Sequence, residues 1–303
     1  MSGLFNLFLN NLAPILLIAG SGYVLGRRFK IDPRTFSQVL FYFFSPCLVF
    51  NSLAKNQLSD SDFLNVAGFA ITVVFLLGLL SWGIGSALRL ERHLLAAVMI
   101  TSMFDNAGNL GLSVTYFAFG DAALARASVI FVVYGTLTNT VGVVIASMGK
   151  SGLRQALLIL LKMPALYALI LGVLFSRQGW VLPQFLDRAV SMATNATIPC
   201  MLVLLGVQLQ RARWTGHTRA LVTATSLRML ASPVIAIGLS ALFGLQGSTR
   251  QASILEASMP TAVMCTILAT EFDVEPSFVT SVVFVTTILC PLTITPLLSY
   301  LGG

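Results

Sequence analysis

The sequence predicts an all-α polytopic membrane protein with ten transmembrane helices, arranged as an inverted repeat of five and five. Three observations lead to this fold class: the composition, a series of apolar segments and an internal repeat. Hydrophobic residues make up 56% of the 303 residues and charged residues only 10%, whereas a soluble domain averages about 25% charged residues. Because a soluble fold could not bury this much apolar surface, we expect the lipid bilayer to surround the chain.

Ten segments approach the length of about 20 apolar residues that a transmembrane helix needs. They cover residues 4–26, 35–54, 63–88, 93–118, 123–148, 156–176, 184–208, 218–244, 250–271 and 276–300. Lys and Arg gather in the loops after segments 1, 3, 5 and 7: Arg27, Arg28, Lys30, Arg34, Arg89, Arg92, Lys150, Arg154, Arg211, Arg213 and Arg219. Because basic loops stay cytoplasmic, both termini are expected on the outer side of the membrane.

The two halves of the chain repeat each other. Pro46-Cys47 reappears 153 positions later as Pro199-Cys200, and 128–132 reappears at the same offset as 281–285. An offset of 150 relates three further pairs: Pro14 and Pro164, Gly22 and Gly172, Pro33 and Pro183. Since each unit, 1–149 and 150–303, holds an odd number of spans, the second must enter the membrane in the opposite sense.

The fourth apolar segment contains a polar and glycine-rich cluster at its middle: Asp105, Asn106, Gly108, Asn109 and Gly111. Glycine loosens a helix, and Asn and Asp offer side chains to the freed backbone groups. Non-helical backbone at membrane depth is tolerated where it is buried or lines a cavity. We therefore expect helix 4 to be broken here, although an ordinary kink remains the alternative.

The repeat offset of 153 maps Asn106 to Met259 and Ala107 to Pro260. Proline removes a backbone donor, so helix 9 is expected to break at Ser258-Met259-Pro260-Thr261. Breaks at equivalent positions of two inverted halves predict crossed helices and a substrate site at the membrane midplane. The freed N–H groups and positive helix ends would favour a carboxylate, to which the Asn106 and Asn109 amides could donate.

Short motifs in three segments resemble those of the auxin efflux carrier family, which includes bacterial malate-permease-like proteins. Residues 106–111 resemble its Asn-x-Gly-x-x-Gly signature, 256–262 its Met-Pro-x-Ala segment, and 198–209 its proline-rich start and glycine-containing end of helix 7. The resemblance covers essentially the whole chain. The short central loop at 149–155 differs from the long one of plant members and favours a prokaryotic protein.

This resemblance implies an elevator-type carrier of small organic anions, such as dicarboxylates or auxin-like acids. It implies a scaffold domain of helices 1, 2, 6 and 7, a transport domain of helices 3–5 and 8–10, and a homodimer formed through the scaffold. The expected location is the plasma membrane, here a bacterial inner membrane, with both termini periplasmic. Pro46 and Pro199 are expected to kink scaffold helices beside the site.

Ionisable residues inside a membrane are functional candidates. Asp105 adjoins the first break and could carry a coupling proton, coordinate Na⁺ or cap a half-helix. Glu256 precedes Pro260 by one turn on the same face, as a second ion ligand or as the partner of Arg228. Arg228 could instead neutralise a carboxylate substrate. Tyr134 could line a polar seam facing the break, or bond to a neighbouring helix.

Several other functions are not expected. The net charge of +7 could suggest nucleic acid, but the basic residues lie in short loops, as topology signals do. The chain offers neither a metal nor a nucleophile constellation, so we expect no enzyme and no cofactor beyond a coupling H⁺ or Na⁺. A sodium-coupled symporter of the bile-acid type remains the alternative, but segment 9 holds few polar residues for it.

Overall fold

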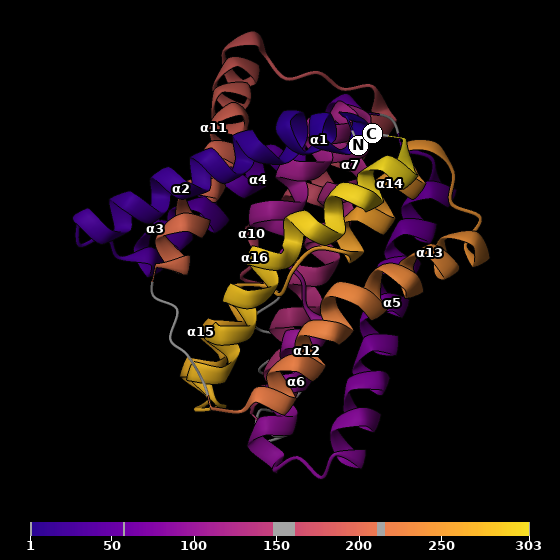
Figure 1. The fold of residues 1–303 in the computed structure, drawn as a ribbon. Coiled ribbons are helices and arrows are strands. Elements are labelled where there is room, and N and C mark those ends of the chain that lie inside the picture. Colours follow the sequence, from indigo (N-terminus) through magenta and orange to yellow (C-terminus); the bar gives the residue numbers. More distant parts are fainter. Residues whose placement is uncertain (1, 57, 148–160, 211–215, 303) are drawn as a thin grey trace.

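The computed structural model describes residues 2–56, 58–147, 161–210 and 216–302, which form helices and no strand (Figure 1). In the first half the helices are α1 (Ser2–Leu7), α2 (Ala13–Arg28), α3 (Pro33–Val39), α4 (Ser45–Lys55), α5 (Asp60–Ala87), α6 (Arg92–Met103), α7 (Leu112–Leu137) and α8 (Val143–Ala146). In the second half they are α10 (Pro164–Gln178), α11 (Gln184–Leu209), α12 (Thr218–Ser226), α13 (Ser232–Leu242), α14 (Gly247–Ala257), α15 (Met264–Glu271) and α16 (Pro276–Leu301). Short π-helical turns join some of them: η1 (Phe8–Leu12), η2 (Leu40–Phe44), η3 (Ala107–Gly111), η4 (Thr138–Gly142) and η5 (Leu227–Ala231).

Seven helical stretches among the described residues are long and apolar enough to cross a membrane, whereas the sequence predicted ten. One stretch, Ala107–Ala146, runs for 40 residues without the loop expected near residue 120. Gly120 marks that place by a single positive φ of 71°, which turns the chain inside α7. The expected junction between the two halves at 149–150 and the start of the segment 156–176 lie outside the described residues.

Prolines explain three of the π-helical turns. Pro14, Pro46 and Pro233 each stand two residues after such a turn, η1, η2 and η5 respectively. A proline ring clashes with the carbonyl one turn earlier, and the wider π turn accommodates the ring. Pro199 lies inside α11, which continues through it without such a turn. The two prolines expected to kink the scaffold therefore differ in their local structure.

In each of two helix pairs, the two helices approach each other closely at a glycine. The α2 helix packs on α11, and α10 packs on α4. A methyl group at Gly22 would meet the backbone of Val203, and one at Gly172 would meet the backbone of Phe50. These glycines bring the paired backbones together at the two crossings, so each crossing depends on the absence of a side chain.

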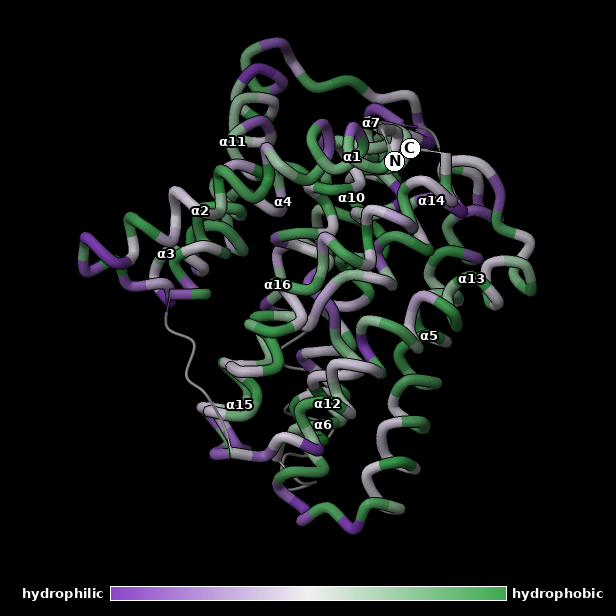
Figure 2. Tube along the Cα trace, viewed as in Figure 1, coloured by the Kyte–Doolittle hydropathy of each residue, from purple (hydrophilic) through white to green (hydrophobic). Residues whose placement is uncertain are grey.

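The polar residues lie at the ends of the helices and their connections, and apolar residues dominate between them (Figure 2). The two termini lie close together, where α1 contacts α16 (Figure 1). Ion pairs join segments that are distant in sequence: Lys55 with Asp187 at 2.9 Å, Arg177 with Asp60, Arg126 with Asp62 at 3.7 Å, and His217 with Glu275 at 3.8 Å.

Candidate functional site

Two non-helical segments meet in the interior of the molecule. Helix α6 ends at Met103, and its chain continues through Phe104–Asn106 into η3; helix α14 ends at Ala257, and α15 begins only at Met264. The Asn106 amide donates to the Pro260 carbonyl at 2.7 Å, and the Ala262 amide donates to the Phe104 carbonyl at 3.0 Å. These bonds form an isolated antiparallel bridge between Asp105 and Thr261. Backbone groups released from both helices thus satisfy each other.

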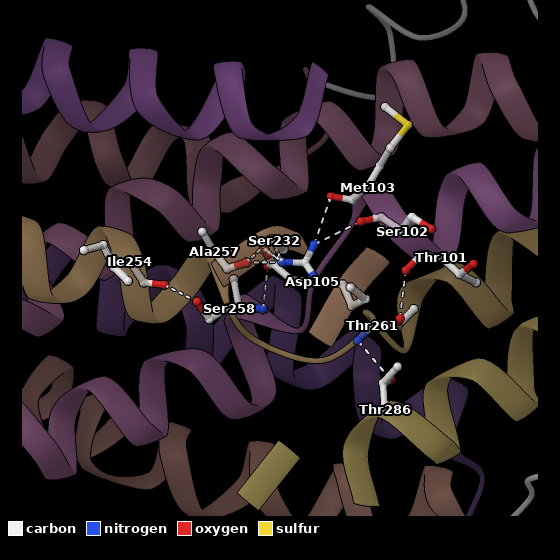
Figure 3. Close-up of polar contacts among 12 residues, drawn as sticks. Thr101, Ser102, Met103, Asp105, Ser232, Ile254, Ala257, Ser258, Thr261 and Thr286 are labelled. Atoms are coloured by element: carbon white, nitrogen blue, oxygen red, sulfur yellow. Dashed lines mark hydrogen bonds and ion pairs between the residues drawn. The ribbon is translucent and has the colours of Figure 1, made fainter. Parts of the chain in front are cut away.

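Thr261 fixes this meeting point with its side chain and its backbone. Its hydroxyl donates to the Thr101 carbonyl at 2.8 Å, and its amide donates to the Thr286 hydroxyl at 3.2 Å (Figure 3). Thr261 is fully buried, and so are both of its partners. It therefore links α6, α16 and the segment before α15.

Arg228, in η5, is completely buried and binds the carboxyl ends of both interrupted helices. Its Nη1 donates to the Ser102 carbonyl at 3.2 Å and to the Met103 carbonyl at 3.5 Å. Its Nη2 donates to the Ala257 carbonyl and, at 2.7 Å, to the Ser232 hydroxyl. The Asp105 carboxylate lies 3.7 Å from Nη2, and Figure 3 shows the labelled partners gathered around Asp105.

The sequence left open whether Arg228 pairs with Glu256 or neutralises a substrate, and among the described residues the ion pair of Arg228 is with Asp105. The Glu256 carboxylate instead accepts a hydrogen bond from the Thr115 hydroxyl at 2.9 Å and packs directly against Gly111 of η3. Arg228 turns to Asp105 and to helix-end carbonyls because those carbonyls carry the negative end of the helix dipole.

A cavity of 70 Å³ lies at the start of η3. Of the residues predicted for the site, Asp105, Asn106, Gly108, Asn109 and Tyr134 line it. The lining does not include five other predicted residues: Met259, Pro260, Thr261, Glu256 and Arg228. The residues from Asp105 to Asn109 and helix α7 therefore form the wall of the cavity, together with Ala262–Met264. Pro260 holds the backbone in place through its carbonyl, which accepts from the Asn106 amide.

Three buried polar atoms of residues that line this cavity have neither a hydrogen-bond nor an ion-pair partner among the described residues. They are Asn106 Nδ2, Asn109 Oδ1 and the Tyr134 hydroxyl. A buried polar group without a partner costs about 1–3 kcal/mol, so three such groups around one small space indicate a place for a polar ligand.

A larger cavity of 400 Å³ adjoins the first and shares Phe41, Phe131, Gly135, Asn139 and Met264 with it. Arg34 and Lys162 also line this larger cavity. The rings of Phe41 and Phe131 stack with their centroids 6.5 Å apart, where the two cavities meet. The larger cavity thus has two basic residues in its lining and adjoins the smaller one at an aromatic pair.

Neither of the two expected scaffold prolines lines the 70 Å³ cavity. Pro199 lines a separate cavity of 670 Å³ together with Asn51 and Lys55, and Pro46 is absent from that lining. Pro46 follows η2, the turn that carries Phe41. Among the described residues, no group of three or more His, Cys, Asp or Glu is placed to hold a metal ion.

Sequence reasoning did not identify Ser232, Thr115 or Thr286 as parts of the site. One signal was present for Ser232, which stands four residues after Arg228 and thus on the same helix face. Thr115 and Thr286 carry no such signal, because they approach their partners from helices distant in sequence.

An all-α protein with several membrane-crossing helices and interrupted segments around a buried polar cavity has the features of a membrane transporter. The chain belongs to the family described as membrane transport protein, which matches residues 7–155 and 148–298 and includes the auxin efflux carriers. The resemblance inferred from the sequence is thereby confirmed. The family is one of transporters and not of enzymes.

Two similar proteins come from archaea. An uncharacterized transporter of Methanothermobacter thermautotrophicus is 29% identical over 91% of this chain and 92% of its own length. The uncharacterized transporter MJ1031 of Methanocaldococcus jannaschii is 26% identical over 90% of this chain and 92% of its own length. Auxin efflux carrier component 3a of Oryza sativa is 26% identical over 45% of this chain, which covers 23% of the plant protein.

Proposed function

We propose that this transporter is a secondary active carrier of small organic anions, with the anion bound beside Asn106, Asn109 and Tyr134. The observation that carries the proposal is the pair of buried, unpartnered donors at the 70 Å³ cavity, Asn106 Nδ2 and the Tyr134 hydroxyl. The N-terminal end of η3 and α7 adds a positive dipole suited to a carboxylate, although the Ala107 amide there already donates to Asp105 Oδ1 at 3.1 Å. The carboxylate class covers dicarboxylates and auxin-like acids.

The anion would reach this place from the 400 Å³ cavity. Arg34 and Lys162 would attract it there, and separation of the stacked Phe41 and Phe131 rings would admit it. Because ligand pockets usually measure about 300–1,000 Å³, the 70 Å³ inner cavity would widen when an organic acid binds. This requirement is compatible with a protein that alternates between two arrangements.

We further propose ten spans in an inverted repeat, with helices 4 and 9 broken and crossed, and elevator-type alternating access. The glycine crossings support the repeat. Gly22 meets Val203 and Gly172 meets Phe50, and the sequence offsets of 150 and 153 relate Gly22 to Gly172 and Phe50 to Val203. Each half thus contributes the same pair of positions to the two crossings. Helices α2, α4, α10 and α11 would form the scaffold.

Uptake of labelled organic acids into liposomes, driven by imposed pH or Na⁺ gradients, tests this function. The Asn109→Ala variant is expected to raise the KM because it removes a polar side chain from the cavity wall. Thr72→Ala offers a matched control, since Thr72 bonds only within α5, to the Gly68 carbonyl. An unchanged KM in Asn109→Ala would refute this placement of the substrate.

Asp105 is the residue proposed to respond to the coupling ion, H⁺ or Na⁺, since its carboxylate lines the cavity. The Asp105→Asn variant is expected to lose gradient-driven uptake while it retains counterflow exchange of substrate. Full gradient-driven uptake by Asp105→Asn would show that coupling resides elsewhere.

We also propose a plasma-membrane location, in a bacterial inner membrane with both termini periplasmic, and a homodimer formed through the scaffold. The adjacent termini support a common side for both ends. Reporter fusions at each terminus test the orientation, and the mass of the detergent-solubilised protein tests the dimer. Activity of a reporter that works only in the cytoplasm would contradict the periplasmic placement of the termini. The mass of a monomer would contradict the homodimer.

A further inference from the structure

The buried guanidinium of Arg228 occupies a cluster of oxygen atoms from four parts of the chain. Three of these are carbonyl oxygens at the ends of two interrupted helices: Ser102 and Met103 of α6, and Ala257 of α14. The others are the Ser232 hydroxyl, which also donates to the Ala257 carbonyl at 2.6 Å, and the Asp105 carboxylate. All five oxygens surround one positive charge in the interior of the protein.

Such a cluster of negatively polarised oxygen atoms is stable only with a cation at its centre. Each helix end carries roughly half a negative charge, and the Asp105 carboxylate would add a full one in the buried interior. In transporters with interrupted helices, unwound carbonyls and the carboxyl ends of half-helices coordinate Na⁺. Carbonyl, hydroxyl and carboxylate oxygens are also the ligands that hard cations take.

We propose that Arg228 is a built-in cation that replaces a coupling Na⁺ between the ends of α6 and α14. This inference rests on the proposed function, of which it specifies the coupling: Na⁺ does not bind at this position and does not drive transport through it. A guanidinium stays charged and presents five donors in a fixed plane, so it can bind several carbonyls at once without leaving the protein.

The neighbouring π turn explains how the side chain reaches this place. Arg228 belongs to η5, which directly precedes Ser232 and Pro233 at the start of α13. Pro233 imposes the wider turn, and Ser232, four residues after Arg228, lies on the same face and binds its Nη2. The local sequence thus places the cation and one of its ligands together.

The nearby acid on the other interrupted helix does not compete for Arg228. Glu256 accepts from Thr115 on α7 and packs against Gly111. Asp105 is the acidic residue that forms an ion pair with Arg228 in the described chain. Removal of the Arg228 side chain would therefore leave the helix-end carbonyls and Asp105 as an uncompensated set of cation ligands.

Thermal unfolding of the purified, full-length protein in detergent tests this inference without any substrate. The probes are NaCl and N-methyl-D-glucamine chloride at equal ionic strength. The wild-type protein is expected to unfold at the same Tm in both salts. Arg228→Ala is expected to have a lower Tm, which Na⁺ but not N-methyl-D-glucamine raises by about 3 °C or more when Na⁺ exceeds its Kd tenfold.

Two further variants serve as controls. Arg228→Lys keeps a buried positive charge and is expected to show no Na⁺-specific change in Tm. Arg126→Ala removes an arginine from the ion pair with Asp62, away from the ends of α6 and α14. It is likewise expected to show no Na⁺-specific change in Tm. A Na⁺-specific response in Arg228→Lys would contradict the argument from charge.

Selective stabilisation of the wild-type protein by Na⁺ would overturn the proposal, whether or not Arg228→Ala folds. A folded Arg228→Ala variant that ignores Na⁺ would also overturn it. In liposomes, uptake by the wild-type protein is expected to be equal in the two salts. If no organic acid is taken up, the proposed function fails, while the Tm measurements still decide whether Arg228 stands in for Na⁺.

Discussion

The Tyr134 hydroxyl offers a test that separates the needs of substrate binding from those of folding. Tyr134 is 2% exposed, and its hydroxyl has no hydrogen-bond partner among the described residues. A buried donor without a partner costs about 1–3 kcal/mol. The Tyr134→Phe variant keeps the ring and removes this donor. We therefore expect the empty protein to gain about 1–3 kcal/mol in free energy of unfolding.

The same substitution should weaken substrate binding. If the hydroxyl donates to the carboxylate of the bound anion, the lost bond is worth about 1.5–3 kcal/mol, because hydrogen bonds to charged groups are the stronger ones. Since about 1.4 kcal/mol corresponds to a factor of ten, the apparent affinity should fall about ten- to hundredfold. Tyr134→Phe is thus expected to be more stable without substrate and to bind the substrate more weakly.

Thermal unfolding without substrate and concentration-dependent uptake into liposomes measure the two effects. Each kcal/mol should raise the Tm by about 2–4 °C in a chain of this size. Tyr23→Phe is the matched control, because Tyr23 is 38% exposed and does not line the cavity. A Tyr134→Phe variant with a lower Tm, or with unchanged uptake, would refute the reasoning, since the hydroxyl would then have a structural partner or no role in binding.

Further predictions concern the packing around the two interrupted segments. Gly111→Ala places a methyl group against the Glu256 carboxylate and should lower the free energy of unfolding, measured by thermal unfolding, by about 1–3 kcal/mol. The control is Gly238→Ala in α13, where the methyl group meets nothing within 4 Å. This variant should be neutral or slightly stabilising. Equal Tm values for the two variants would contradict the close contact at Gly111. Thr261→Val removes the donor to the Thr101 carbonyl and should cost about 1–3 kcal/mol by thermal unfolding; an unchanged Tm would mean that this bond does not hold the segments together.

Parts of the candidate site follow from the order of residues alone. The run from Asp105 to Asn109 is polar within an apolar segment, and polar groups in such a position must find a partner or a cavity. In the structure these residues line a cavity. Tyr134 could be chosen only as one of several polar residues, because a single hydroxyl on an apolar helix bonds equally well to a neighbouring helix.

The partners of Glu256 and Arg228 could not be deduced in the same way. Opposite charge made a pair of these two residues one of the alternatives, but each has a different partner. Carbonyl groups occur at every residue, so the sequence does not reveal which of them are free to bind an arginine. That depends on where α6 and α14 end and on their meeting in space.

The sequence by itself determined the membrane class, the helical architecture and membership of the transporter family, since composition, apolar segments and short motifs are properties of the chain in order. Only the tertiary structure decided which polar atoms face the cavity and what surrounds Arg228. The physical reason is that both depend on convergence: carbonyls, hydroxyls and a carboxylate from separate helices form one cluster only after those helices have packed together.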